Sequence, residues 1–335
     1  MEFLDRMGFS SRYNSTSDYR YGSTITADSI LGIKYVGSAN SLDMKPYPII
    51  ETTPSMIFQI NTHALSLGML SSSKILTTKL IENDIFSNQE KILSDVLDQQ
   101  ISMFTQVPFI DLETSNLGPI QQDQYTVWRK TVPDKPGILT WHIQIDRPDM
   151  LYAYFPVLSQ RTAYISLNDK LIGKTIDPDN YGVIPLGTFQ PGDEISVSLQ
   201  FDAESISFFD TFFMYEDQAE LAKRFDEKIT PLTNIKKLSS SHLSGEISAE
   251  EPGQWLLLTI PYSDEWQVTL NGRPVTAEKV LDALMAVPLE QGHNFLELKF
   301  VPKGFEFGAI LSCLSLFIFA LSELKRHGVS TKRPW

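Results

Sequence analysis

Two segments of this 335-residue chain, about a hundred residues apart, repeat one succession of strand, asparagine turn and strand. The turns of "AYISLNDKLIG" and "WQVTLNGRPV" contain Asn168 and Asn271, and each asparagine precedes a proline, Pro185 or Pro288, by 17 residues. Asparagine tolerates the positive φ angle that tight hairpins require. The matched spacing therefore predicts one β-sandwich topology used twice, over residues 124–202 and 240–301.

Alternating side chains support the same architecture. In "ILTWHIQID", Trp141, Ile143 and Ile145 share one strand face, while the residues between them are polar. This period of two is typical of half-buried antiparallel strands. Chance similarity between two all-β stretches is the competing explanation, but several landmarks with matching spacing count against it.

Helical patterns are fewer. Ser87 and Glu90 have the S-x-x-E spacing of a capping box and predict a helix that begins near Ser87. Thr26 is the expected cap of a short turn through Ser29, and "DQAELAKRFDEKI" predicts a helix that ends near Ile229. We therefore expect a mainly β (α+β) fold, with two related antiparallel β-sandwich or jelly-roll-like units, a few helices and one C-terminal transmembrane helix.

Composition divides the chain into five parts. The proline-containing stretch "KPYPIIETTP" indicates a linker before residue 55, and the serine-rich stretch "KKLSSSHLSG" (236–245) indicates a joint that follows the first domain. The expected parts are an N-terminal segment that continues from an upstream membrane region (1–54), a first β-sandwich domain with helical insertions (55–230), a smaller second β-sandwich domain (231–303), a transmembrane helix (304–323) and a basic cytoplasmic tail (324–335).

The apolar run "FGAILSCLSLFIFAL" from Phe307 to Leu321 contains no charged residue. With its flanks it reaches the roughly 20 residues that a spanning helix needs. Lys325 and Arg326 follow, and no acidic residue occurs among the last twelve. The positive-inside rule then predicts a cell-membrane protein with residues 1–303 extracellular and the C-terminal tail cytoplasmic. A buried C-terminal helix is the alternative.

The N-terminal residues do not explain such an orientation. "MEFLDRMGFSS" has neither the basic region nor the apolar region of a signal peptide. A chain that begins in this way has nothing to start its export. We therefore expect it to be the C-terminal part of a larger membrane protein, whose upstream helices would deliver it to the outer face.

Charge and residue usage exclude several classes of function. The formal net charge of −13 argues against a nucleic-acid partner, since phosphate backbones recruit basic faces. Cys313 is the single cysteine, so no intrachain disulfide can form, and the five histidines lack the spacing of metal ligands. "NDKLIGKT" resembles a phosphate loop but has Asn168 where the first glycine belongs. We expect no metal, no cofactor and no catalytic residue in this chain.

Aromatic residues offer the best candidates for ligand contacts. Trp128, Trp255 and Tyr262 are possible sugar-stacking residues, because a flat aromatic face can pack on an apolar sugar face. Trp141 and Trp266 lie in phase with the apolar residues of their strands, which favours a role in the core.

Three stretches together resemble the YfhO-type bacterial membrane proteins: "FLDRMGF…YGST…ADSILGIKYV", "HALSLGM" before "FSNQEKIL", and the run from Ile260 to Ser312. The resemblance covers most of the chain. It implies the C-terminal extracellular region and last transmembrane helix of a GT-C glycosyltransferase, a class that uses polyprenyl-phosphate-linked sugars. It also implies a part in teichoic acid or cell-envelope glycosylation.

The resemblance leaves this chain itself without catalytic residues, because the acidic motif expected in such families lies near the first membrane helices. Its implied partners are the lipid bilayer and, through the full-length protein, a cell-wall polymer or a polyprenyl-linked sugar. A membrane-anchored carbohydrate-binding or structural module without an enzymatic link is the alternative function.

Overall fold

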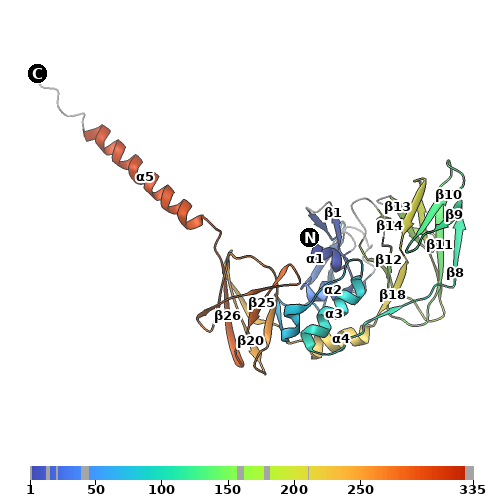
Figure 1. Ribbon diagram of the computed structural model, residues 1–335, viewed down its shortest axis with the longest axis horizontal. Helices are drawn as coiled ribbons and strands as arrows, with labels where there is room; N and C mark the ends of the chain where they lie inside the picture. The colour runs from blue at the N-terminus through green and yellow to red at the C-terminus, as the bar shows by residue number, and fades with distance from the viewer. Residues whose placement is uncertain are drawn as a thin grey trace, which may run out of the picture.

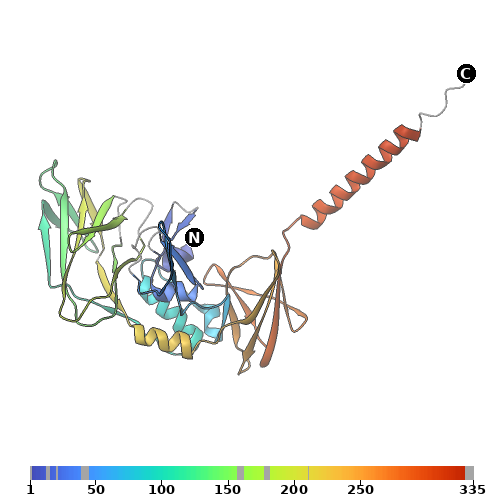
Figure 2. The same ribbon diagram turned by 180° about the vertical axis from the view of Figure 1, so that it is seen from behind.

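The computed structural model describes residues 2–12, 16–19, 22–38, 45–156, 162–176, 182–209 and 211–328. Among these residues, the buried hydrophobic side chains form three clusters. Two clusters are the cores of β-sandwiches, and the third belongs to a mixed body of helices and short strands. This mixed body lies between the two sandwiches, and a long C-terminal helix projects away from all three (Figures 1 and 2).

The first sandwich packs two antiparallel sheets face to face. The larger sheet has the strand order β14-β13-β16-β11-β8 and the smaller has the order β15-β12-β18-β7. Its strands are β7 (Phe104–Gln106), β8 (Asp111–Ser115), β11 (Gly137–Gln144), β12 (Met150–Tyr154), β13 (Ala163–Leu167), β14 (Lys170–Ile176), β15 (Ile184–Gly187), β16 (Glu194–Phe201) and β18 (Phe212–Glu216). Trp141 is 2% exposed in the core, which confirms its predicted place there.

The second sandwich has the sheets β19-β20-β26-β22-β23 and β24-β25-β21-β6. Its strands are β6 (Gly68–Ser71), β19 (Thr233–Ser239), β20 (His242–Ala249), β21 (Trp255–Pro261), β22 (Trp266–Leu270), β23 (Arg273–Val275), β24 (Glu278–Val280), β25 (Leu284–Pro288) and β26 (Gly292–Phe300). Strand β6 comes from far upstream in the chain and pairs with β21. The predicted division at residues 54, 230 and 303 stays a prediction.

The two sandwiches are related, as the repeated hairpin predicts. Each larger sheet has the same order, with β13, β14, β16 and β11 corresponding to β22, β23, β26 and β20. Asn168 and Asn271 occupy equivalent turns, with φ angles of 48° and 52°. The Asn168 Oδ1 accepts from the Ser196 backbone N–H at 2.9 Å, and the Asn271 Oδ1 accepts from that of Phe295 at 2.8 Å. Both turns therefore use the same side-chain bond to the central strand.

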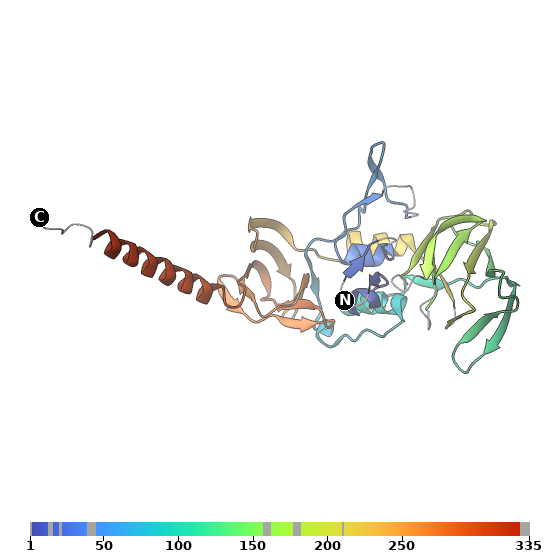
Figure 3. The ribbon, with the colours of Figure 1, turned by 90° about the horizontal axis from the view of Figure 1, so that it is seen from above.

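A three-stranded sheet lies beside the first sandwich. It has the order β17-β10-β9 and contains β9 (Leu117–Gln121), β10 (Thr126–Lys130) and β17 (Ser205–Phe208). Trp128 of β10 packs against the sandwich core. This contact fixes the position of the long β9–β10 hairpin, which Figure 3 shows at the far end of the molecule from the C-terminal helix.

The mixed body contains four short helices: α1 (Glu2–Arg6), α2 (Ile25–Ile30), α3 (Ile85–Leu97) and α4 (Gln218–Glu227). It also contains a 3-10 turn, η1 (Ser73–Thr77), the pair β1 (Ser10–Arg12) and β2 (Thr16–Asp18), and a sheet of β3 (Tyr35–Ser38), β5 (Ile57–Ile60) and β4 (Ile49–Thr52). Strand β4 lies within the stretch predicted as a linker, so that prediction was wrong for these four residues. Pairing with β5 supplies hydrogen-bond partners that a linker would leave to water.

Two predicted helix starts were also wrong. Helix α3 begins at Ile85, before Ser87, so Ser87 and Glu90 do not form a capping box. The Glu90 carboxylate instead accepts from the backbone N–H groups of Met103 and Phe104, at 2.6 and 2.9 Å. Thr24, not Thr26, caps α2. The Glu90 and Thr26 side chains, which the local pattern assigned to caps, instead contact residues that are distant in the sequence.

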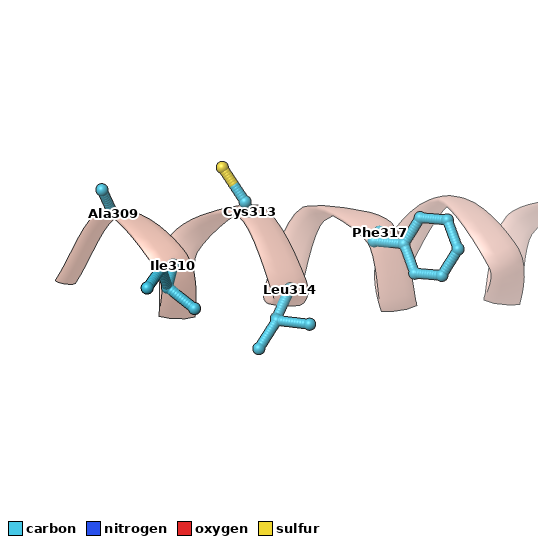
Figure 4. A pocket seen from close by; sticks show the side chains of 5 residues that line it. All are labelled: Ala309, Ile310, Cys313, Leu314 and Phe317. Carbon is cyan, nitrogen blue, oxygen red and sulfur yellow. The ribbon is translucent and has the colours of Figure 1, made fainter. Parts of the chain in front are cut away.

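The C-terminal helix α5 (Phe305–Gly328) is continuous. Of the helices described, it alone is long and apolar enough to cross a membrane, over Phe307–Arg326, and none of that stretch is buried by the rest of the chain. Figure 4 shows a shallow hollow along it, lined by Ala309, Ile310, Cys313, Leu314 and Phe317. This hollow is the surface of the helix itself, and a lipid environment would cover it.

Candidate functional site

The three predicted sugar-stacking residues lie against three different cores. Trp128 contacts the first sandwich, Trp255 of β21 contacts the mixed body, and Tyr262 contacts the second sandwich. Tyr262 also donates its hydroxyl to Asp264 Oδ1 at 3.0 Å. The structure therefore does not bring these residues into one site, and the sugar-stacking role of each stays a prediction.

Trp128 lines a pocket of about 240 Å³ between the β17-β10-β9 sheet and the first sandwich. Its aromatic wall combines Trp128 with Trp141, Phe109 and Phe209. Trp141 is almost fully buried, whereas Phe109 is 42% exposed, so the aromatic lining extends from the core to the surface. Tyr125 stacks edge-on against Phe209, with ring centroids 6.4 Å apart, and supports that side of the pocket.

Polar groups accompany the aromatic wall. Gln106, Thr126 and Thr211 also line the pocket. The Thr126 hydroxyl donates to Gln121 Oε1 at 2.9 Å, so its orientation is set from within the sheet. A concave, mostly apolar surface with a few polar groups is the usual form of a small-ligand site. Pockets that enclose drug-sized ligands have roughly 300–1,000 Å³, so this smaller one suits a single ring of a larger molecule.

The sequence pattern identified only part of this pocket. Trp128 was a predicted contact and Trp141 a predicted core residue, but Phe109 and Phe209 lie outside the alternating strands and carry no pattern of their own. Both come next to Trp128 because β7, β8 and β17 converge at this edge of the sandwich. A sheet-to-sheet contact of this kind has no local signal in the sequence.

A second cluster of functional groups lies in the mixed body, and its members are buried except for Tyr19, which is half-buried. Asp28 of α2 and Lys45 form an ion pair at 2.5 Å in which neither side chain is exposed. Asp28 Oδ2 also accepts from the hydroxyls of Tyr19, at 2.6 Å, and Tyr47, at 2.8 Å. Burial, followed by the Asp28 charge, raises the pKa of Tyr47 far above its ordinary value, so the Tyr47 hydroxyl keeps its proton and donates it to Asp28.

Glu216, at the end of β18, caps the start of α2 from the first sandwich. Its carboxylate accepts from the backbone N–H of Thr26 at 2.7 Å and of Ile25 at 3.3 Å, and from the Tyr152 hydroxyl at 2.6 Å. Burial raises the pKa of Glu216, and the hydrogen bonds from Tyr152 and Thr26 offset only part of that increase. Because Glu216 is fully buried, this cluster joins α2 to the sandwich and offers no opening for a polymer.

Comparison with known proteins places this chain in a family. The profile described as "Bacterial membrane protein YfhO" matches residues 1–312. The chain belongs to the YfhO family. A relative from Bacillus subtilis (strain 168), described as "Uncharacterized protein YfhO", is 34% identical over 65 residues. The matched segment covers 19% of this chain and 8% of that relative, so the chain spans a small part of the relative's length.

Solved structures show only distant likeness to this YfhO-family chain. A family 35 carbohydrate binding module from Clostridium thermocellum has a TM-score of 0.26 at 10% identity, covering 34% of this chain and 99% of that one. The arabinofuranosyltransferase AftD from Mycobacteria has a TM-score of 0.20 at 10% identity, covering 44% of this chain and 12% of that one. TM-scores this low do not establish a shared fold and assign no function to this chain.

Proposed function

We propose that this chain is the envelope-facing, carbohydrate-binding part of a GT-C-class membrane glycosyltransferase that acts in teichoic acid or cell-envelope glycosylation. In this proposal α5 anchors the chain, and the first sandwich holds the acceptor polymer through the Trp128 pocket. Membership of a bacterial membrane protein family supports the anchoring. The observation that carries the binding role is the aromatic pocket, whose lining extends from buried Trp141 to exposed Phe109.

We propose further that sugar transfer itself takes place outside this chain. A carboxylate that acts as a general base must be held within hydrogen-bond reach of the proton it abstracts, with its pKa tuned by burial or neighbouring groups. Asp146, just after β11, and Glu297 of β26 have side chains that are 67% and 38% exposed. Asp28 Oδ2 and the Glu216 carboxylate are buried and already accept from tyrosine hydroxyls. Sugar transfer by the purified chain, abolished by replacing one of its own carboxylates, would contradict this part of the proposal.

Replacing Trp128 with alanine is expected to weaken binding of teichoic acid or its repeat unit at least tenfold, about 1.4 kcal/mol. Trp128 contributes its indole ring to the pocket wall, and aromatic anchors commonly dominate the energetics of an interface. The measurement is calorimetric titration of the full chain in lipid nanodiscs. Trp128→Ala could also disturb the sandwich, so Phe109→Ala, at the exposed edge of the pocket, provides a second test.

Tyr35→Ala is the matched control for both variants, because Tyr35 is 63% exposed on β3 of the mixed body. It should bind as the unaltered chain does. If the pocket variants retain full affinity while the polymer binds, the acceptor site lies elsewhere. If the unaltered chain binds no envelope polymer, the structural-module alternative is favoured.

The orientation of α5 has its own test. With Lys325 and Arg326 held in the cytoplasm by the positive-inside rule, protease added to intact cells should destroy an epitope in the second sandwich and spare a tag at the C-terminus. Near-complete loss of the first signal and retention of the second is the expected result, measured by immunoblot. Protection of the sandwich epitope, or loss of the tag, would reverse the proposed topology.

A further inference from the structure

A hollow of about 420 Å³ lies where the second sandwich meets α5. Part of its lining is apolar: Phe300, Val301, Pro302 and Phe305. Ser241, Gln267 and Lys299 supply the polar part. It is separate from the Trp128 pocket, which belongs to the first sandwich.

Backbone pairing holds the walls of this hollow together. Gln267 of β22 and His242 of β20 are the register partners of Lys299 on either side of β26. The Phe300 backbone N–H donates to the Ser241 carbonyl at 2.8 Å, which holds the β19–β20 turn against the end of β26. Trp266 packs edge-on against Phe300, with ring centroids 5.0 Å apart. The hollow is therefore part of the folded sandwich.

The cation in the hollow is available to a ligand. Lys299 is exposed, and its ammonium group forms no ion pair with an acidic side chain among the residues whose side chains the structure describes. Neighbouring charges are already paired: Glu297 faces His242 at 3.7 Å, and Lys303 faces Asp264 at 3.4 Å. Lys299, with the amide of Gln267 and the hydroxyl of Ser241, can therefore offer a positive charge and hydrogen-bond donors to an anion.

The position of the hollow identifies the ligand as a lipid. Phe305 lines the hollow and is also the first residue of α5. The candidate span begins at Phe307, within one helical turn, about 5.4 Å along the axis. The headgroup layer outside the hydrocarbon core is roughly 5–7 Å thick on each side. A hollow at this level lies among the lipid phosphates, and Trp266, which packs on Phe300 of its lining, is of a residue type enriched at that interface.

We propose that this hollow binds the phosphate headgroup of an anionic phospholipid from the leaflet that faces the sandwiches. Lys299 neutralises the phosphate, Gln267 and Ser241 donate to its oxygens, and the acyl chains lie along the apolar surface of α5. The chain carries a net charge of −13, so an anionic surface repels it overall, and a local cation at the anchor offsets that repulsion. This inference rests on the proposed insertion of α5 into the bilayer.

Native mass spectrometry of the full chain, released from vesicles of phosphatidylglycerol and phosphatidylcholine, tests the proposal. We expect one phosphatidylglycerol molecule to remain bound in preference to phosphatidylcholine, and Lys299→Gln to reduce its occupancy about tenfold. Lys299→Arg should restore it. Lys279→Gln, on exposed β24 of the other sheet, is the matched control and should leave occupancy unchanged.

Two further experiments distinguish failure of the lipid-binding inference from failure of the proposed function. Flotation with vesicles tests insertion: a chain that does not float contradicts the proposed function, whereas a floating chain without phosphatidylglycerol preference contradicts only this inference. Inorganic phosphate at millimolar concentration should not displace the lipid. Displacement would overturn the lipid assignment in favour of a simple anion site. Unchanged melting temperatures for the Lys299 variants would confirm that the comparison is between folded chains.

Discussion

Replacement of Asp28 with alanine is expected to lower the free energy of unfolding by about 3–5 kcal/mol. The change leaves the Lys45 ammonium group fully buried without its carboxylate, and it removes the acceptor of the Tyr19 and Tyr47 hydroxyls. A buried charge that has lost its counter-ion costs far more than the same charge in water. Urea denaturation followed by circular dichroism measures the loss.

A double variant distinguishes the buried charge from the lost packing. Asp28→Ala combined with Lys45→Met removes both charges, so it should recover much of the stability lost in the single variant. Lys74→Met is the surface control, because the Lys74–Asp98 pair is more than half exposed and should contribute nothing measurable. If Asp28→Ala were no more destabilising than Lys74→Met, the ion pair would not hold the mixed body together.

Glu216→Ala is expected to cost about 3 kcal/mol or more, because it leaves two buried donors without their acceptor. These are the backbone N–H of Thr26 and the hydroxyl of Tyr152, whereas the Ile25 N–H keeps the Tyr152 oxygen as an acceptor at 3.0 Å. Hydrogen exchange should show faster opening of the α2 amides than of the β20–β26 pair in the second sandwich. Equal acceleration in both would mean that Glu216 acts on the whole chain and not on the junction.

The contribution of Glu216 to the free energy of unfolding should depend on pH with a defined sign. Because burial raises the pKa of Glu216 in the folded chain, the folded state binds its proton more tightly than the unfolded state. The stability from this proton is fully present below the unfolded pKa, near 4.5, and is lost as pH rises through the folded pKa. Glu216→Gln keeps the shape but does not titrate, so its stability relative to the unaltered chain should rise with pH across that window. A flat difference would contradict the shift.

The sequence predicts those parts of this protein whose structure depends on residues close together in the chain. A strand with one buried face shows its period of two within a few residues, and Asn168 and Asn271 mark their turns by a property of asparagine itself. The two related sandwiches could therefore be predicted from the sequence. The apolar helix α5 follows equally from a continuous run of residues.

Only the tertiary structure shows the contacts between residues that are far apart in the sequence. Strand β6 completes a sheet with β21, nearly two hundred residues later, and Glu216 caps a helix that begins at Ile25. Glu90 does not form the predicted capping box, because its carboxylate accepts from the backbone N–H groups of Met103 and Phe104 instead. Phe109 and Phe209 likewise meet Trp128 only where separate strands converge. The polar contacts arise because buried polar groups need hydrogen-bond partners, and the aromatic contacts arise because apolar surface is buried away from water. In both cases the path of the chain through space determines which partner lies within reach.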